Sequence, residues 1–160
     1  MMDNYIQLKK NNVLKIGIKD AEGNDTGNYL EFDLEDISLP LRIQQLDEEH
    51  KKNLNYLKMQ FALIDKKEEK SGKKLFTNKE EEKMKILIEF YDRESKTLDL
   101  LLGEGGTAKM LNGRKPYYEM FNDIMEALEP LEPIFKKGYE NVKNKIVEKY
   151  KLSETDVMEG

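Results

Sequence analysis

The chain has 160 residues, of which 38% are hydrophobic and 37% are charged, and this length and composition predict one folded domain with a small core. Its formal net charge of −5, from 27 basic and 32 acidic residues, argues against nucleic acid and anionic membranes as partners. The absence of cysteine and the presence of a single histidine exclude disulfides, thiolate metal sites and sites built from several histidines, and fit an intracellular compartment.

No apolar run approaches the roughly 20 residues that are needed to span a bilayer. The segment from Met1 to Lys10 also lacks the apolar core of a signal peptide. We therefore expect a soluble protein that stays in the cytoplasm.

The first predicted element is a β-hairpin over residues 13–34, because apolar residues alternate there with a period of two. The segment 20–27 contains two glycines together with Asn and Asp residues, which suit a turn between two strands. Tyr5, Ile6 and Leu8 are a candidate third strand. The alternating apolar residues of the hairpin are Leu14, Ile16, Ile18, Leu30, Phe32 and Leu34.

Two long amphipathic helices are predicted next, over residues 40–67 and 78–102, because apolar residues recur in both at steps of three and four. Ser38 is the candidate cap of the first helix. Thr77 and Glu80 have the spacing of a capping box at the start of the second. Gly103 supplies the stop, since glycine adopts the backbone angles that end a helix.

Two further helices are predicted over residues 117–128 and 134–150, with Pro116 at the first helical position of the earlier one. Pro130 and Pro133 interrupt the apolar pattern between them, since proline has no amide donor and disfavours helical angles in the residue before it. The sequence thus predicts an α+β fold that is mainly α, with an N-terminal β-hairpin followed by a bundle of three to five helices. Residues 1–152 form a single domain and residues 153–160 a frayed tail.

A glycine-dense break follows the second long helix, from Gly103 to Gly106, and a short helical turn is expected over residues 107–111. The break does not complete a phosphate-binding loop, because Lys109 follows alanine and Met110 replaces the hydroxyl residue. His50 lies on the apolar stripe of the first long helix and is interpreted as a boundary or packing residue. No nucleophile, base and orienting group can be assembled, so we predict no catalytic residue, no metal ligand and no cofactor.

The break and its surroundings resemble the tail assembly chaperones of siphophages and prophages of Gram-positive bacteria. The residues that carry this resemblance are the hairpin at 13–34, the helix end and glycine segment at 98–106, the short turn at 107–111 with Asn112 and Gly113, and the start of the helix that follows Pro116. The resemblance covers roughly residues 12–128, and the helix at 134–150 extends beyond the shorter members of that family.

The resemblance implies a non-enzymatic protein that binds the phage tape measure protein, keeps it soluble and helps to recruit tail tube protein. It implies a homo-oligomer in the cytoplasm of the bacterial host, absent from the mature virion. Exposed helical grooves would suit such a client. The residues that we expect to bind the client or a second copy, because they form an apolar stripe with aromatic and methionine content, are Tyr118, Phe121, Met125, Phe135 and Tyr139.

Two other functions remain open from the sequence. The chain could be a structural head or tail completion protein, which would be present in purified phage particles. It could also be a host-directed protein-binding module, which would bind a folded host protein and show no preference for the tape measure protein.

Overall fold

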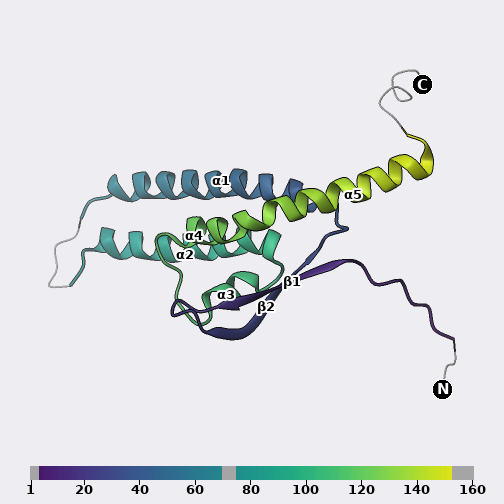
Figure 1. Ribbon diagram of the computed structural model, residues 1–160. Helices are drawn as coiled ribbons and strands as arrows, with labels where there is room; N and C mark the ends of the chain where they lie inside the picture. The colour runs from purple at the N-terminus through teal and green to yellow at the C-terminus, as the bar shows by residue number, and fades with distance from the viewer. Residues whose placement is uncertain (1–3, 70–74, 153–160) are drawn as a thin grey trace.

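The computed structural model describes residues 4–69 and 75–152 and shows an α+β fold that is mainly α, as predicted. A two-stranded hairpin packs at one end of a pair of long helices, and the other helices pack around the place where the hairpin meets this pair (Figure 1). The predicted tail at 153–160 lies outside the described residues. The elements in chain order are β1 Val13–Lys19, β2 Asp25–Asp33, α1 Leu39–Asp65, α2 Asn78–Leu102, α3 Gly106–Leu111, α4 Met120–Leu128, the 3-10 turn η1 Glu129–Leu131 and α5 Glu132–Tyr150.

Strands β1 and β2 pair antiparallel, with Ile16 opposite Leu30. In the described part of the chain the sheet has these two strands only, so the expected third strand at Tyr5, Ile6 and Leu8 was wrong. These side chains are exposed, and their segment runs away from the hairpin (Figure 1). Tyr5 and Ile6 are adjacent, so a strand would place them on opposite faces, and four polar residues separate the segment from β1.

Helices α1 and α2 form the long antiparallel pair, and their bounds agree with the predicted ranges to within two residues. The capping box is confirmed: Thr77 Oγ1 accepts from the amide of Glu80, and the Thr77 amide donates to the Glu80 carboxylate. The predicted cap at Ser38 was wrong, because its hydroxyl donates to Asp36 Oδ1 at 2.6 Å instead. This hydrogen bond, with Arg42 beside it, lowers the pKa of the Asp36 carboxyl below its usual value.

The two prolines separate α4 from α5 as predicted, and the separation takes the form of η1. Helix α5 begins at Glu132, with Pro133 inside its first turn. The predicted start of α4 at residue 117 was wrong, because residues 117–119 form a turn in which the Met120 amide donates to the carbonyl of Tyr117. Pro116 therefore lies outside the helix.

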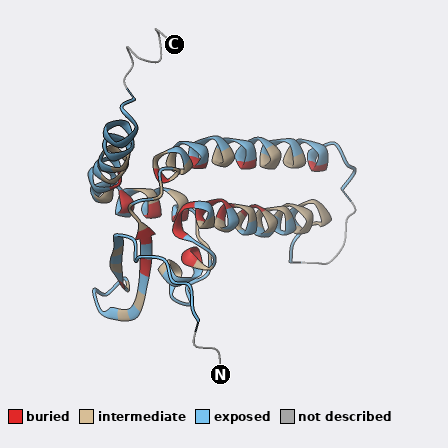
Figure 2. Cartoon of the chain, turned by 90° about the vertical axis from the view of Figure 1, so that its right-hand side faces the viewer, coloured by how far each residue is buried: buried red, intermediate tan, exposed pale blue. Residues whose placement is uncertain are grey.

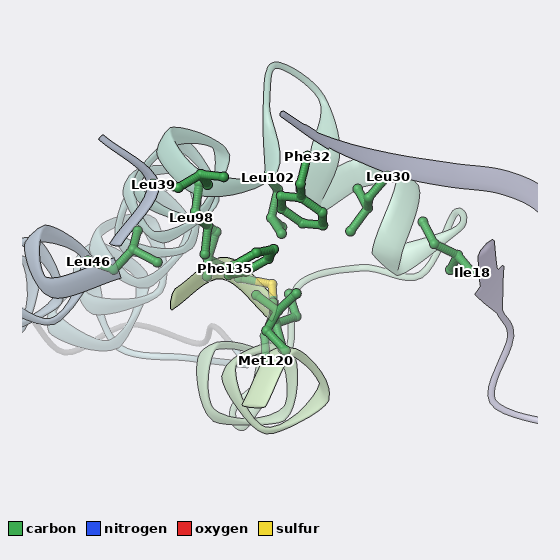
Figure 3. Close-up of a cluster of buried hydrophobic side chains, with 12 residues drawn as sticks. Ile18, Leu30, Phe32, Leu39, Leu46, Leu98, Leu102, Met120 and Phe135 are labelled. Carbon is green, nitrogen blue, oxygen red and sulfur yellow. The ribbon is translucent and has the colours of Figure 1, made fainter. Parts of the chain in front are cut away.

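The core lies where the hairpin meets the helices (Figure 2). Phe32 from β2 and Phe135 from α5 have ring centroids 4.9 Å apart, and Met120 points toward them from α4 (Figure 3). Leu98 and Leu102 close this cluster from the C-terminal end of α2. A hairpin alone is at best marginally stable in water, so these helices supply the cover that its apolar face needs.

Two parts of the molecule extend beyond this core. One is the end of the α1–α2 pair that is distant from the hairpin, and the other is the second half of α5 (Figure 1). Figure 2 shows exposed residues along the outer part of α5. Apolar side chains are exposed on both, and on α5 these are Ile146, Val147 and Tyr150, followed by Leu152.

Candidate partner-binding surfaces

The first candidate surface is a groove of about 270 Å³ between α1, α2 and the start of α4, which we call the interhelix groove. Most of its walls are apolar or aromatic. The polar residues of its lining are His50, Glu94, Glu119 and Asn122. The side chains that form the walls are Leu54 and Leu57 from α1, Leu87, Phe90 and Tyr91 from α2, and Tyr118, Met120 and Phe121 from the start of α4 and the turn before it.

A buried polar network includes two of the residues that line the interhelix groove, His50 and Glu94. Glu94 is only 2% exposed, and its two carboxylate oxygens lie 2.6 Å from His50 Nδ1 and 2.7 Å from Asn53 Nδ2. Asn53 also donates to Thr97 Oγ1 at 3.0 Å. Because a buried carboxylate is costly unless its oxygens are hydrogen-bonded, this network lets α2 carry a glutamate on the face that meets α1.

His50 also positions an aromatic wall of the groove. Its ring stacks on Phe121 with centroids 3.9 Å apart and planes 6° from parallel. The interpretation of His50 as a packing residue is therefore confirmed. Nearby, burial raises the pKa of the Tyr91 phenol above its usual value, and Tyr118 and Glu94 add to this shift. Tyr91 is thus neutral over the physiological range.

The five predicted binding residues do not lie on one surface. Tyr118 is 86% exposed at the mouth of the interhelix groove, and Phe121 lines its wall. Met125 lies on the same helix but lines a second groove, which shares Glu119 and Asn122 with the first. Phe135 is 3% exposed and belongs to the core, so the single stripe predicted from the sequence does not form one surface. Tyr139 is half-buried on α5.

The second candidate surface is a groove of about 390 Å³ along α4, η1 and the start of α5, which we call the acidic groove. Its floor is apolar and its rim carries carboxylates, while lysine and arginine are absent from its described lining. The floor residues are Ile43, Leu101, Met125, Leu128 and Phe135, and the rim residues are Glu119, Asp123, Glu126, Glu129 and Glu132.

Sequence reasoning missed the acidic groove. The signal was present, because the rim acids recur at steps of three and four from residue 119 to residue 132. Asp123 accepts from the Tyr117 hydroxyl at 2.7 Å, which raises the pKa of Tyr117, and Glu119 accepts from Asn122. The other three rim side chains make no hydrogen bond or ion pair with any residue that the structure describes.

The glycine-dense break between α2 and α3 has a structural role. Asp99 accepts hydrogen bonds from the amides of Gly105 and Thr107, at 3.1 and 2.8 Å, and from the Thr107 hydroxyl at 2.7 Å. The amides that a phosphate would need at this helix start therefore bond to a carboxylate of the chain itself. The expected short helix is confirmed as α3.

Within residues 4–69 and 75–152, no group of three or more histidine, aspartate or glutamate side chains is arranged to hold a metal ion. None of the helices described is long and apolar enough to span a bilayer. Comparison of the chain with protein-family models, with curated proteins and with solved structures finds no match.

Proposed function

We propose that this chain is a non-enzymatic phage tail assembly chaperone that binds the tape measure protein, keeps it soluble and helps to recruit tail tube subunits. In this proposal it acts without a cofactor in the cytoplasm of the bacterial host and is absent from the mature virion. The support is the resemblance of the segment around residues 98–113 to such chaperones, together with the interhelix groove. The groove is the observation that carries the binding role.

The interhelix groove has the properties that helix-in-groove recognition requires. An amphipathic client helix places apolar side chains at steps of three and four into such a groove, and the aliphatic and aromatic walls here offer that contact. Tyr118 stands exposed at the mouth, and tyrosine is among the residues that most often dominate binding energy. The stacked pair of His50 and Phe121 holds one wall in place before the client arrives.

The test is coexpression with the tape measure protein encoded in the same genome, scored as the amount of soluble complex. Leu54→Glu places a charge in the wall of the groove, and we expect it to weaken client binding by at least about tenfold. Leu63→Glu is the matched control, because Leu63 lies on the same helix, is half-exposed and does not line the groove. Circular dichroism of both variants checks that the helices persist.

Equal binding by the two variants would argue against the groove as the client site. Failure of the unsubstituted chain to solubilise the tape measure protein would argue against the chaperone function itself. Mass spectrometry of purified particles addresses the structural alternative, because a completion protein would be present in stoichiometric amounts and a chaperone would not.

A further inference from the structure

The second half of α5 presents an apolar face that nothing in the described chain covers. Helix α5 packs against the core and the start of α1 through its first half, and then extends away from the body in both views (Figures 1 and 2). Ile146 is 42% exposed and Tyr150 is 61% exposed. These two residues are four apart and share one face with Tyr139 and Val142, so they form a continuous stripe.

The same part of the helix is basic. From Val142 to Lys151 the chain carries four lysines and one glutamate, a formal charge of +3 in a chain whose net charge is −5. Lys149 lies next to the stripe, with its ammonium over the Tyr150 ring. A partner for this face therefore needs an apolar centre and a negatively charged rim.

The acidic groove has this chemistry. Its floor is apolar, its rim carries five carboxylates, and its described lining contains no basic side chain. Glu126, Glu129 and Glu132 are the rim acids without a hydrogen bond or ion pair to the described residues, so their charges face solvent uncompensated. A basic amphipathic helix placed in the groove would supply both the missing charge and the apolar contact.

Helix α5 cannot fill the acidic groove of its own molecule. Its first turns form part of that groove, through Glu132 and Phe135, and the helix then runs away from it. Ile146 lies eleven residues beyond Phe135, which places it about 16 Å further along the helix axis at 1.5 Å per residue. The complementary surfaces of one chain can therefore meet only between two copies.

We propose that the distal part of α5, from Ile146 to Tyr150, docks in the acidic groove of a second copy of this chain. The contact joins two different surfaces, so in a pair one copy keeps its groove and the other keeps its α5 available for a further copy. The chain then assembles head to tail with increasing concentration. The acidic groove shares Glu119 and Asn122 with the interhelix groove, but the rim acids Glu126, Glu129 and Glu132 line the acidic groove alone, and the contact does not depend on the proposed client.

Thiol crosslinking tests the contact, because the chain contains no cysteine and each introduced thiol is unique. One variant carries Ile146→Cys on the stripe, and a second carries Glu129→Cys at the rim. The two are mixed and treated with a short bismaleimide. Lys58→Cys, which replaces an exposed residue of α1 outside both grooves, takes the place of the rim variant in the control mixture.

We expect the mixture of the Ile146 and Glu129 variants to give a covalent dimer at least about tenfold faster than the control mixture, as for contacts held by specific binding. Crosslinking of the Ile146→Cys variant alone at the same rate would overturn the proposal in favour of an α5–α5 dimer. Equal rates in the two mixtures would overturn it as well.

Sedimentation velocity of the cysteine-free chain supplies an independent measurement. The average mass should rise with concentration, and Ile146→Ser should weaken this self-association about tenfold, as expected for an apolar residue at the centre of an interface. Ile88→Ser on α2 is the control, because Ile88 is more exposed than Ile146 and lies outside both grooves. A mass that stays monomeric up to near-millimolar protein would contradict the proposal, whatever the client experiment shows.

Discussion

Asp99 determines how the chain passes from α2 to α3. Its carboxylate accepts from the amides of Gly105 and Thr107 and from the Thr107 hydroxyl, whose single proton is also within hydrogen-bond distance of the carbonyl of Ser95. The side chain thus acts as an N-terminal cap supplied from the preceding helix. Gly105 has a φ of 73°, a conformation that glycine adopts without strain, and this brings the amides round to face Asp99.

Asp99→Ala should lower the free energy of unfolding by about 1–2 kcal/mol, the usual effect of removing a helix cap. The reason is that Thr107 is buried and its amide loses its acceptor, while its hydroxyl keeps only the carbonyl of Ser95. Urea denaturation measures the change, with Asp92→Ala on the exposed face of α2 as control. If both alanine variants had the same stability as the unsubstituted chain, the capping role of Asp99 would be refuted.

At the scale of single residues, the sequence predicts contacts between residues that are close together along the chain. The capping box at Thr77 was predictable because its two residues are three apart and need no other part of the chain. The contact between His50 and Glu94 joins residues 44 apart on two helices, so no spacing indicates it. Ser38 failed as a cap because a nearby carboxylate, Asp36, takes its hydroxyl hydrogen bond.

At the scale of elements, α5 is attached to the hairpin by a close backbone approach. A Cβ atom added at Gly138 would lie 2.6 Å from the carbonyl oxygen of Leu34, so only glycine fits against the end of β2. This contact and the stacking of Phe135 near Phe32 hold the first half of α5 in place. They also set the direction in which its second half extends (Figure 1).

Gly138→Ala should lower the free energy of unfolding by about 1 kcal/mol, because a clash with backbone costs about 1–3 kcal/mol and helix propensity returns up to about 1 kcal/mol. Gly17→Ala is the control, since nothing lies within 4 Å of its added Cβ and its φ is not positive. We expect the control to be neutral or slightly stabilising in urea denaturation. A Gly138→Ala variant as stable as the control would show that α5 adjusts freely.

Element positions were largely predictable, because the two long helices have clear apolar periodicity and the prolines mark the end of α4. The arrangement of the candidate binding residues in space was not predictable in this way. Phe121, Met125 and Phe135 belong to one apolar pattern in the sequence, but Phe121 and Met125 line different grooves although both lie on α4, and Phe135, after η1, is buried against Phe32. A periodic stripe indicates which residues of a helix are apolar, but not which neighbours they contact in the fold.

At the scale of the whole molecule, charge is divided unevenly. Helix α5 is positive in a chain that is negative as a whole, and the acidic groove lies at the opposite end of the same helix from its exposed stripe. Such an arrangement favours association in one orientation, with the basic end of one copy on the acidic rim of the next.

Self-association should therefore weaken as salt is added. The screening length falls from about 10 Å at 0.1 M to about 3 Å at 1 M ionic strength, so the rim contacts lose most of their attraction. Sedimentation at low and high salt measures this, and a variant with Lys145→Gln and Lys149→Gln should show a smaller salt effect. Association that strengthens with salt would indicate a purely apolar contact.

The buried network between α1 and α2 has a mechanical consequence. Both oxygens of Glu94 bond to side chains of α1, so sliding one helix along the other by a single turn, about 5.4 Å, would leave a buried carboxyl group without hydrogen-bond partners. That displacement would cost about 1–3 kcal/mol or more, the usual penalty for a buried polar group left unsatisfied. The two helices consequently keep a fixed position relative to each other along their axes. A force applied at the far end of the pair is therefore transmitted to the hairpin, because the helices do not slide past each other.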